Sequence, residues 1–213
     1  MVITIGGHYG SGGKRIAERL ASLLEYRLCD DEIIIEAVKS SGVDMEEETF
    51  RYFDESRGSG SIAEMKRQSS VQRMSYLGAI STLSLDVTPL DRSMAQVQEK
   101  IIRSLASEGN CILMGRCADY YLRDFPNVLS IFVIDDEESC IARVMEHFPK
   151  LDEKEAKRLI RRTDKRRADY YAFFTQKSWG NPSNYDMVLS CSRLGGAELV
   201  SEMLAAGIRV KES

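Results

Sequence analysis

The segment from Val2 to Ala21 constrains the fold of this chain more than any other. A short β-branched run, Val2–Ile5, leads directly into the glycine-rich stretch Gly6–Gly13. A helical pattern follows, with apolar residues three or four positions apart between Ile16 and Leu24. A strand, a glycine-rich loop and a helix in this order bind anions, because the loop N–H groups and the helix N-terminus face the same ligand. The segment therefore predicts a bound phosphate.

The loop departs from the standard phosphate-binding pattern, which is Gly, four residues, Gly, Lys and then Ser or Thr. Gly7 and Gly12 fit the two glycines, but Gly13 stands where the lysine is expected. Lys14 takes the place of the Mg²⁺-binding hydroxyl, and Arg15 follows it. One residue turns a helix by roughly 100°. Two interpretations remain open: a re-registered loop in which Lys14 still reaches the β- and γ-phosphates, or a variant site with altered metal binding.

The same glycines also resemble a dinucleotide-binding fingerprint. Gly6, Gly10 and Gly12 follow the spacing of short-chain dehydrogenases, and Asp30 and Asp31 lie at a suitable distance for a ribose contact. However, the third glycine of G-x-G-x-x-G is missing, and no Tyr-x-x-x-Lys of such a dehydrogenase occurs in the chain. A glycine turn without a ligand is a third interpretation, although so many glycines cost considerable backbone entropy.

The composition excludes several classes of protein. The 213 residues fit one globular domain. The net charge of −4 argues against nucleic-acid binding. We expect no membrane contact, because no stretch resembles a spanning segment or a signal peptide. The five cysteines form no C-x-x-C pair and only two histidines are present, so no metal site is predicted from protein ligands. Reduced, buried thiols in a cytoplasmic protein are expected, and the oligomeric state is left open.

Five apolar runs alternate with helical patterns and predict a parallel sheet flanked by helices. These runs are Val2–Ile5, Tyr26–Cys29, Asn110–Met114, Val128–Ile134 and Asp186–Cys191. Within the fourth run, Ser130–Ile134 is apolar on both faces, as a covered central strand requires. Acidic residues at 135–138 and 152–155 predict two helix N-termini. Residues 41–93 interrupt the alternation, and we expect a helical insertion there with a flexible joint near Gly58–Ser61.

A helix predicted from Asp152 to about Gln176 carries five cations spaced three and four residues apart, which places them on one face. They are Arg158, Arg161, Arg162, Lys165 and Arg166. Like charges in this arrangement repel, so a cationic stripe in an acidic protein favours an anionic ligand. Arginine suits phosphate because its planar fork binds two oxygens at once. The alternative is a solvated charged face.

Polar residues also follow the second and third predicted strands, where ligands of open parallel sheets bind. Asp30 follows the second strand, and Gly115-Arg116 follows the third, with Asp119 one helical turn later. Asp119 could orient Arg116 or contact a ribose. The alternatives are a helix cap for Asp30 and a surface ion pair for Arg116 and Asp119.

Taken together, these segments resemble the nucleoside monophosphate kinases, and specifically the cytidylate kinase-like family, over essentially the whole chain. The shared segments, in order, are GGHYGSGGK, LCDDEII, CILMGRCADYYL, SIFVIDDEE, RLIRRTDKRRADYY and YDMVLSCSRLG. The resemblance implies an α/β, three-layer P-loop NTPase fold with a five-stranded parallel sheet in one domain, residues 1–213. It also implies a helical acceptor-binding insertion over 41–93 and an arginine-rich lid over 151–182.

The resemblance further implies an ATP-dependent kinase that transfers the γ-phosphoryl group to a nucleoside monophosphate, CMP or dCMP first, with Mg²⁺. Matched by position, the residues that would cradle the ATP phosphates are Gly7, Gly10, Ser11, Gly12, Gly13, Lys14 and Arg15. The lid arginines would be Arg158, Arg161, Arg162 and Arg166. The acceptor would contact Asp30, Arg116 and Asp119, and the catalytic cations would be Lys14, Arg116, Arg161 and Arg162.

Two departures from the family pattern support a different activity. The loop has Gly13-Lys14-Arg15 where cytidylate kinases have Lys-Gly-Thr, and Met114 and Cys117 replace the two aspartates of D-G-R-D. The alternative function is therefore a catalytically weak or inactive nucleotide-binding regulatory protein.

Overall fold

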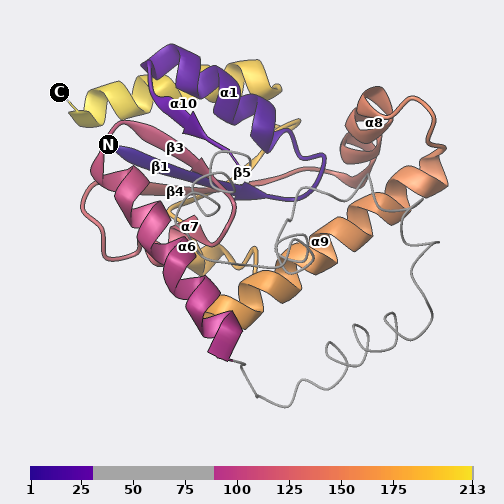
Figure 1. Ribbon diagram of the computed structural model, residues 1–213. Coiled ribbons are helices and arrows are strands. Elements are labelled where there is room, and N and C mark those ends of the chain that lie inside the picture. The colour runs from indigo at the N-terminus through magenta and orange to yellow at the C-terminus, as the bar shows by residue number, and fades with distance from the viewer. Residues whose placement is uncertain (31–88, 213) are drawn as a thin grey trace.

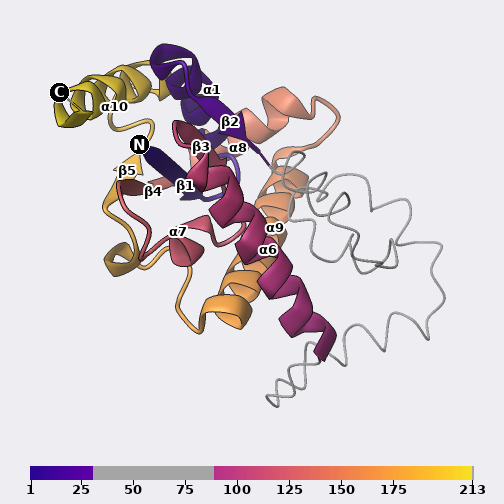
Figure 2. The same ribbon diagram turned by 60° about the vertical axis from the view of Figure 1, so that its left-hand side comes forward.

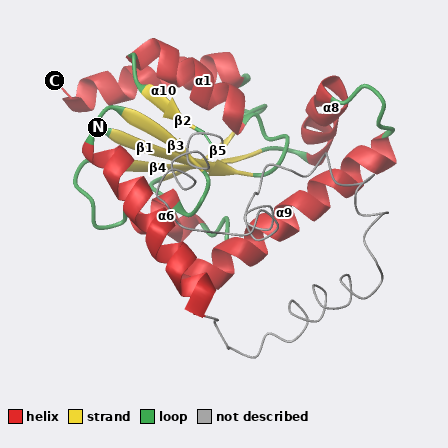
Figure 3. Ribbon diagram, viewed as in Figure 1, coloured by secondary structure: helices red, strands yellow, loops and turns green. Residues whose placement is uncertain are grey.

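The computed structural model describes residues 1–30 and 89–212, which form a five-stranded parallel sheet between two layers of helices (Figure 1, Figure 3). The strands are β1 (Val2–Gly7), β2 (Arg27–Cys29), β3 (Cys111–Met114), β4 (Val128–Ile134) and β5 (Met187–Ser190). Each coincides with one of the five predicted apolar runs. The predicted fold class is confirmed.

The strand order is β2-β3-β1-β4-β5, and every neighbouring pair is parallel. Val2 of β1 stands opposite Cys111 of β3 on one side and Val128 of β4 on the other. In the dinucleotide-binding fold the second strand lies beside the first. Here β3 takes that place and β2 lies at the edge, so the dinucleotide interpretation of the glycine loop is wrong.

Two helices cover one face of the sheet, α1 (Gly13–Leu24) and α10 (Ala197–Glu212) (Figure 1, Figure 2). Alternation along the strands sends Ile3 and Ile5 into this layer. Val2 belongs to the core of the opposite face, together with residues of α6 (Pro89–Ser107) and α7 (Ala118–Tyr121).

The remaining helices, α8 (Glu137–His147) and α9 (Glu153–Thr175), form a hairpin beside the sheet, and α9 returns below it toward α6 (Figure 1). The hairpin has its own apolar cluster, which includes Ile141 and Leu159. Asp136 caps α8, and Asp152 begins α9 in a capping box. Both predicted helix starts are confirmed. A short 3₁₀ turn, η1 (Pro182–Asn184), precedes β5.

Two further expectations concern the insertion and the cysteines. The predicted insertion at 41–93 lies outside the described residues, except that 89–93 begin α6. All five cysteines are buried and reduced, as expected. Among residues 1–30 and 89–212, no helix combines the length and apolar character needed to cross a membrane.

Candidate active site

The glycine loop, taken here from Gly7 at the end of β1 to Gly12 before α1, packs so closely that Gly7, Gly10 and Gly12 must be glycine. A β-carbon on Gly7 would lie 2.4 Å from the carbonyl oxygen of Val133, and one on Gly10 would lie 2.7 Å from that of Cys140. Gly10 and Gly12 also adopt φ values of 80° and 90°, which residues with a side chain rarely adopt. The close packing and the backbone conformation of the loop therefore both require these glycines.

The N-terminus of α1 carries positive charge where helices ordinarily carry negative charge. Its cap residue Gly12 supplies no side-chain hydrogen bond, and the first turn has no acid but contains Lys14 and Arg15. Cations at this end oppose the helix dipole. By contrast, α8 and α9 begin with aspartate caps and glutamates. The first turn of α1 is thus suited to an anion that satisfies both the N–H groups and the cations.

Lys14 and Arg15 differ in their surroundings. The Arg15 guanidinium forms an ion pair of 2.9 Å with Glu198 of α10, and both side chains are exposed. Lys14 is exposed and has no ion-pair partner among the described residues. No hydroxyl follows Lys14, and the described part of the chain has no cluster of three His, Cys, Asp or Glu residues suited to a metal. Lys14 is therefore available to a phosphate group, and within residues 1–30 and 89–212 no carboxylate cluster for a metal accompanies it.

The helix α9 contacts the glycine loop directly. The Asp164 carboxylate accepts a hydrogen bond of 2.7 Å from the Tyr9 backbone N–H, and Arg167 donates one of 3.1 Å to the Gly7 carbonyl. Burial raises the pKa of Asp164, although the Tyr9 hydrogen bond and the neighbouring cations oppose this rise. A carboxylate thus already lies against a loop N–H group.

A second network supports the loop from α8. Arg143 donates a hydrogen bond of 2.8 Å to the Gly10 carbonyl and forms an ion pair of 2.7 Å with Asp135, at the end of β4. Asp135 also accepts a 3.0 Å hydrogen bond from the Ser192 backbone N–H. Burial alone would raise the pKa of Asp135, but the bonds from Ser192 and Arg143 lower it below the ordinary value. This aspartate is therefore occupied in supporting the loop.

The residues after β3 form a turn at the same edge of the sheet as the loop. Arg116 follows β3, is only 4% exposed and adopts a left-handed φ of 56°. Asp119, in α7, accepts a hydrogen bond of 2.6 Å from the Tyr171 hydroxyl of α9, and burial raises its pKa. Asp30 follows β2 and is half-buried. Asp30 and Arg116 thus follow the carboxyl ends of β2 and β3, and Asp119 lies in the helix that comes next in the chain.

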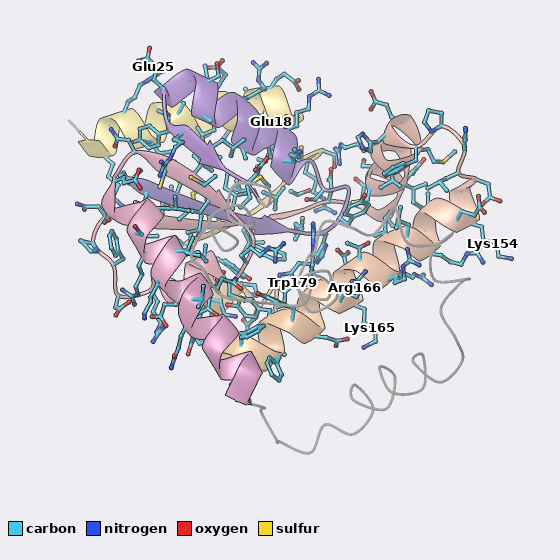
Figure 4. The ribbon with its side chains drawn as sticks, viewed as in Figure 1. Glu18, Glu25, Lys154, Lys165, Arg166 and Trp179 are labelled. Carbon is cyan, nitrogen blue, oxygen red and sulfur yellow. The ribbon has the colours of Figure 1, made fainter. Side chains whose placement is uncertain are left out.

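The predicted cationic stripe lies on the exposed side of α9. Its members Arg158, Arg161, Lys165 and Arg166 are exposed, and Arg162 is half-buried. Arg161 lies 3.4 Å from Glu137 of α8, and Lys165 lies 2.8 Å from Asp169. Figure 4 shows Lys165 pointing from α9 away from the sheet. Both ion pairs of the stripe are thus made with α8 or within α9 and not with the glycine loop.

Sequence reasoning missed the residues of α9 that do reach the loop, Asp164 and Arg167. The signal was present in the helical periodicity. Ile160, Thr163 and Tyr171 are buried, and Asp164 and Arg167 lie on that same side of the helix. Charged residues within a buried stripe need partners, and here the partners are backbone groups of the loop.

Comparisons with known proteins agree with this fold. The sequence profile of the cytidylate kinase-like family matches residues 2–193. The crystal structure of an uncharacterized protein from Eubacterium ventriosum is similar, with 25% identity, a TM-score of 0.69 and coverage of 99% of this chain and 98% of that one. Shikimate kinase from Bacteroides thetaiotaomicron shares the fold, with 11% identity, a TM-score of 0.50 and 98% coverage of both chains. No curated protein matches. The chain belongs to the cytidylate kinase-like family.

Proposed function

We propose that the protein is an ATP-dependent phosphotransferase that transfers the γ-phosphoryl group to a nucleoside monophosphate, with CMP and dCMP as the first candidates. The main support is the uncapped, cationic first turn of α1 behind a loop that requires its glycines. Family membership supports a kinase, and the net charge gives no support for a nucleic-acid substrate.

In this proposal the protein acts mainly by positioning and by neutralising charge. The loop N–H groups and Lys14 hold the ATP phosphates, and Arg116 binds the phosphate of the acceptor. Arg161 and Arg162 approach the transferred group when the α8–α9 hairpin closes and excludes water. Cations in these positions stabilise the charge that develops on the transferred phosphoryl group.

A coupled assay of ADP release against the common nucleoside monophosphates tests the proposal, with calorimetric titration of ATP in the presence and absence of Mg²⁺. Acceptor-dependent ADP release is the expected result. If the protein binds ATP but releases no ADP with any acceptor, the result favours the second candidate, a nucleotide-binding regulatory protein without turnover. That candidate is supported by Arg15, which stands where cytidylate kinases have threonine and is paired with Glu198.

Arg116→Ala is expected to raise the KM for the acceptor by about 10- to 100-fold, the effect of losing one charged hydrogen-bond partner. The KM for ATP should change by less than about threefold, because the ATP phosphates are held elsewhere. Arg116→Lys is the matched variant, since it keeps the charge but loses the planar fork. An intermediate acceptor KM is expected for it. Acceptor kinetics unchanged in Arg116→Ala would rule out the assignment.

Replacing Arg161 and Arg162 together by Gln is expected to lower kcat by at least about tenfold, the scale of a lost transition-state contact. Lys157→Gln is the control, because Lys157 pairs with the same Glu137, at 2.6 Å, but has no proposed phosphate contact. Steady-state kinetics of both proteins make the comparison. If the double variant turns over like the control, the stripe is only a solvated face.

A further inference from the structure

Three consecutive residues after β3 adopt the left-handed backbone conformation. The φ values are 61° for Gly115 and 56° for both Arg116 and Cys117. Only the first is glycine. Left-handed residues with a β-carbon are strained, and they persist where neighbouring groups enforce them. The direction of the Arg116 side chain depends on this conformation, because φ and ψ fix where the β-carbon points.

Gln98 of α6 binds the backbone at the centre of this turn. Its Nε2 donates a hydrogen bond of 2.7 Å to the Arg116 carbonyl, and Gln98 is buried, with only 5% of its surface exposed. The hydroxyl of Tyr170, on α9, donates to Gln98 Oε1. A carbonyl can only accept, so the amide nitrogen must face Arg116 and the amide oxygen must face Tyr170. The Arg116 carbonyl thereby fixes the orientation of the Gln98 amide, and the Tyr170 hydroxyl binds the amide oxygen at its other end.

We propose that Gln98 and Tyr170 are positioning residues that hold the left-handed turn and so aim Arg116 at the acceptor phosphate. The functional part rests on the proposed role of Arg116. The chain of contacts joins three separate elements, since α9 donates a hydrogen bond to a side chain of α6, which in turn binds the turn after β3. A buried amide whose two ends are both used in this way has little freedom to rearrange.

Two variants test the proposal. Gln98→Met keeps the volume but removes both the donor to Arg116 and the acceptor for Tyr170, whereas Tyr170→Phe removes only the hydroxyl. We expect the acceptor KM to rise by at least about tenfold in Gln98→Met and by about threefold in Tyr170→Phe, consistent with loss of a direct and of an indirect hydrogen bond. The KM for ATP should stay within about twofold. Ser201→Ala is the control, because Ser201 is equally buried and its hydrogen bonds stay within α10.

Thermal unfolding of the three variants separates positioning from stability. If Gln98→Met and Tyr170→Phe lower the unfolding midpoint as Ser201→Ala does but leave the acceptor KM unchanged, the positioning role is overturned. A crystal structure of Gln98→Met gives a second readout that needs no turnover. We expect Arg116 to leave the left-handed region there, and an unchanged turn overturns the proposal. Absence of phosphotransfer in the wild type would instead refute the proposed function.

Discussion

Gly7→Ala is expected to abolish ATP binding and to destabilise the protein by about 1–3 kcal/mol, the usual cost of forcing an extra group into a packed interior. The added β-carbon would lie 2.4 Å from the Val133 carbonyl oxygen. Val133 is the β4 residue that stands opposite Gly7 in the sheet. The Val133 carbonyl also accepts a hydrogen bond of 3.0 Å from the His8 N–H, so a shift of Val133 would displace the loop as well. Calorimetric ATP titration and denaturant unfolding measure the two effects.

Two glycine substitutions outside the loop serve as controls. Gly207→Ala, within α10, would meet nothing within 4 Å and should stabilise the protein by about 0.4–1 kcal/mol. Gly109→Ala, at a φ of 75°, also has open space and isolates the cost of a left-handed alanine. Both should bind ATP like the wild type. A folded Gly7→Ala protein with wild-type ATP affinity would remove the loop from the site.

The sequence was sufficient to predict those features that depend on local patterns. The five strands follow from apolar runs, and the starts of α8 and α9 follow from Asp136 and Asp152. The extension of β1 through Gly6 and Gly7 was not predictable, because glycine has a low strand propensity. These residues join the strand since they pair with Phe132 and Val133.

Long-range contacts account for the remaining differences. The position of β3 between β2 and β1 depends on packing that no periodicity encodes. The left-handed conformation of Arg116 and Cys117 has no signature in residue type, since only the preceding Gly115 favours it. Asp164 and Arg167 stand in the sequence among the exposed charged residues of α9, so residue type alone did not distinguish them. Only the structure shows that these two contact the loop.

One helix joins both halves of the candidate site. In α9, Asp164 and Arg167 contact the glycine loop, and Tyr171, two turns after Asp164, binds Asp119 beside the Arg116 turn. If a phosphate bound the Tyr9 N–H in place of Asp164, it would therefore act on a helix that also supports the acceptor side. Substitutions of Asp164 or Arg167 should therefore be assayed for both the ATP and the acceptor KM, because these two residues contact the glycine loop from the helix that also supports the acceptor side.

Lys14→Met is expected to lower kcat/KM for ATP by about 100- to 1,000-fold, the usual effect of removing one group that stabilises developing charge. Lys14 lies in the first turn of α1, one place later than the standard pattern puts its lysine, and it has no ion-pair partner among the described residues. A polyphosphate bound in the loop would supply the missing anion. Steady-state kinetics with varied ATP give the change, and thermal unfolding should show little loss of stability because the side chain is exposed.

Arg15→Met is the matched control, since it removes the neighbouring cation from the same helical turn. Arg15 is already paired with Glu198 at 2.9 Å on the exposed surface, and such pairs contribute little, about 0–1 kcal/mol. Its kcat/KM for ATP should therefore fall by less than about threefold, because its charge is held away from the loop by α10. The two variants together decide the register of the loop. If Arg15→Met is the more damaging, Arg15 must leave Glu198 to bind phosphate, and Lys14 is not the phosphate-binding lysine.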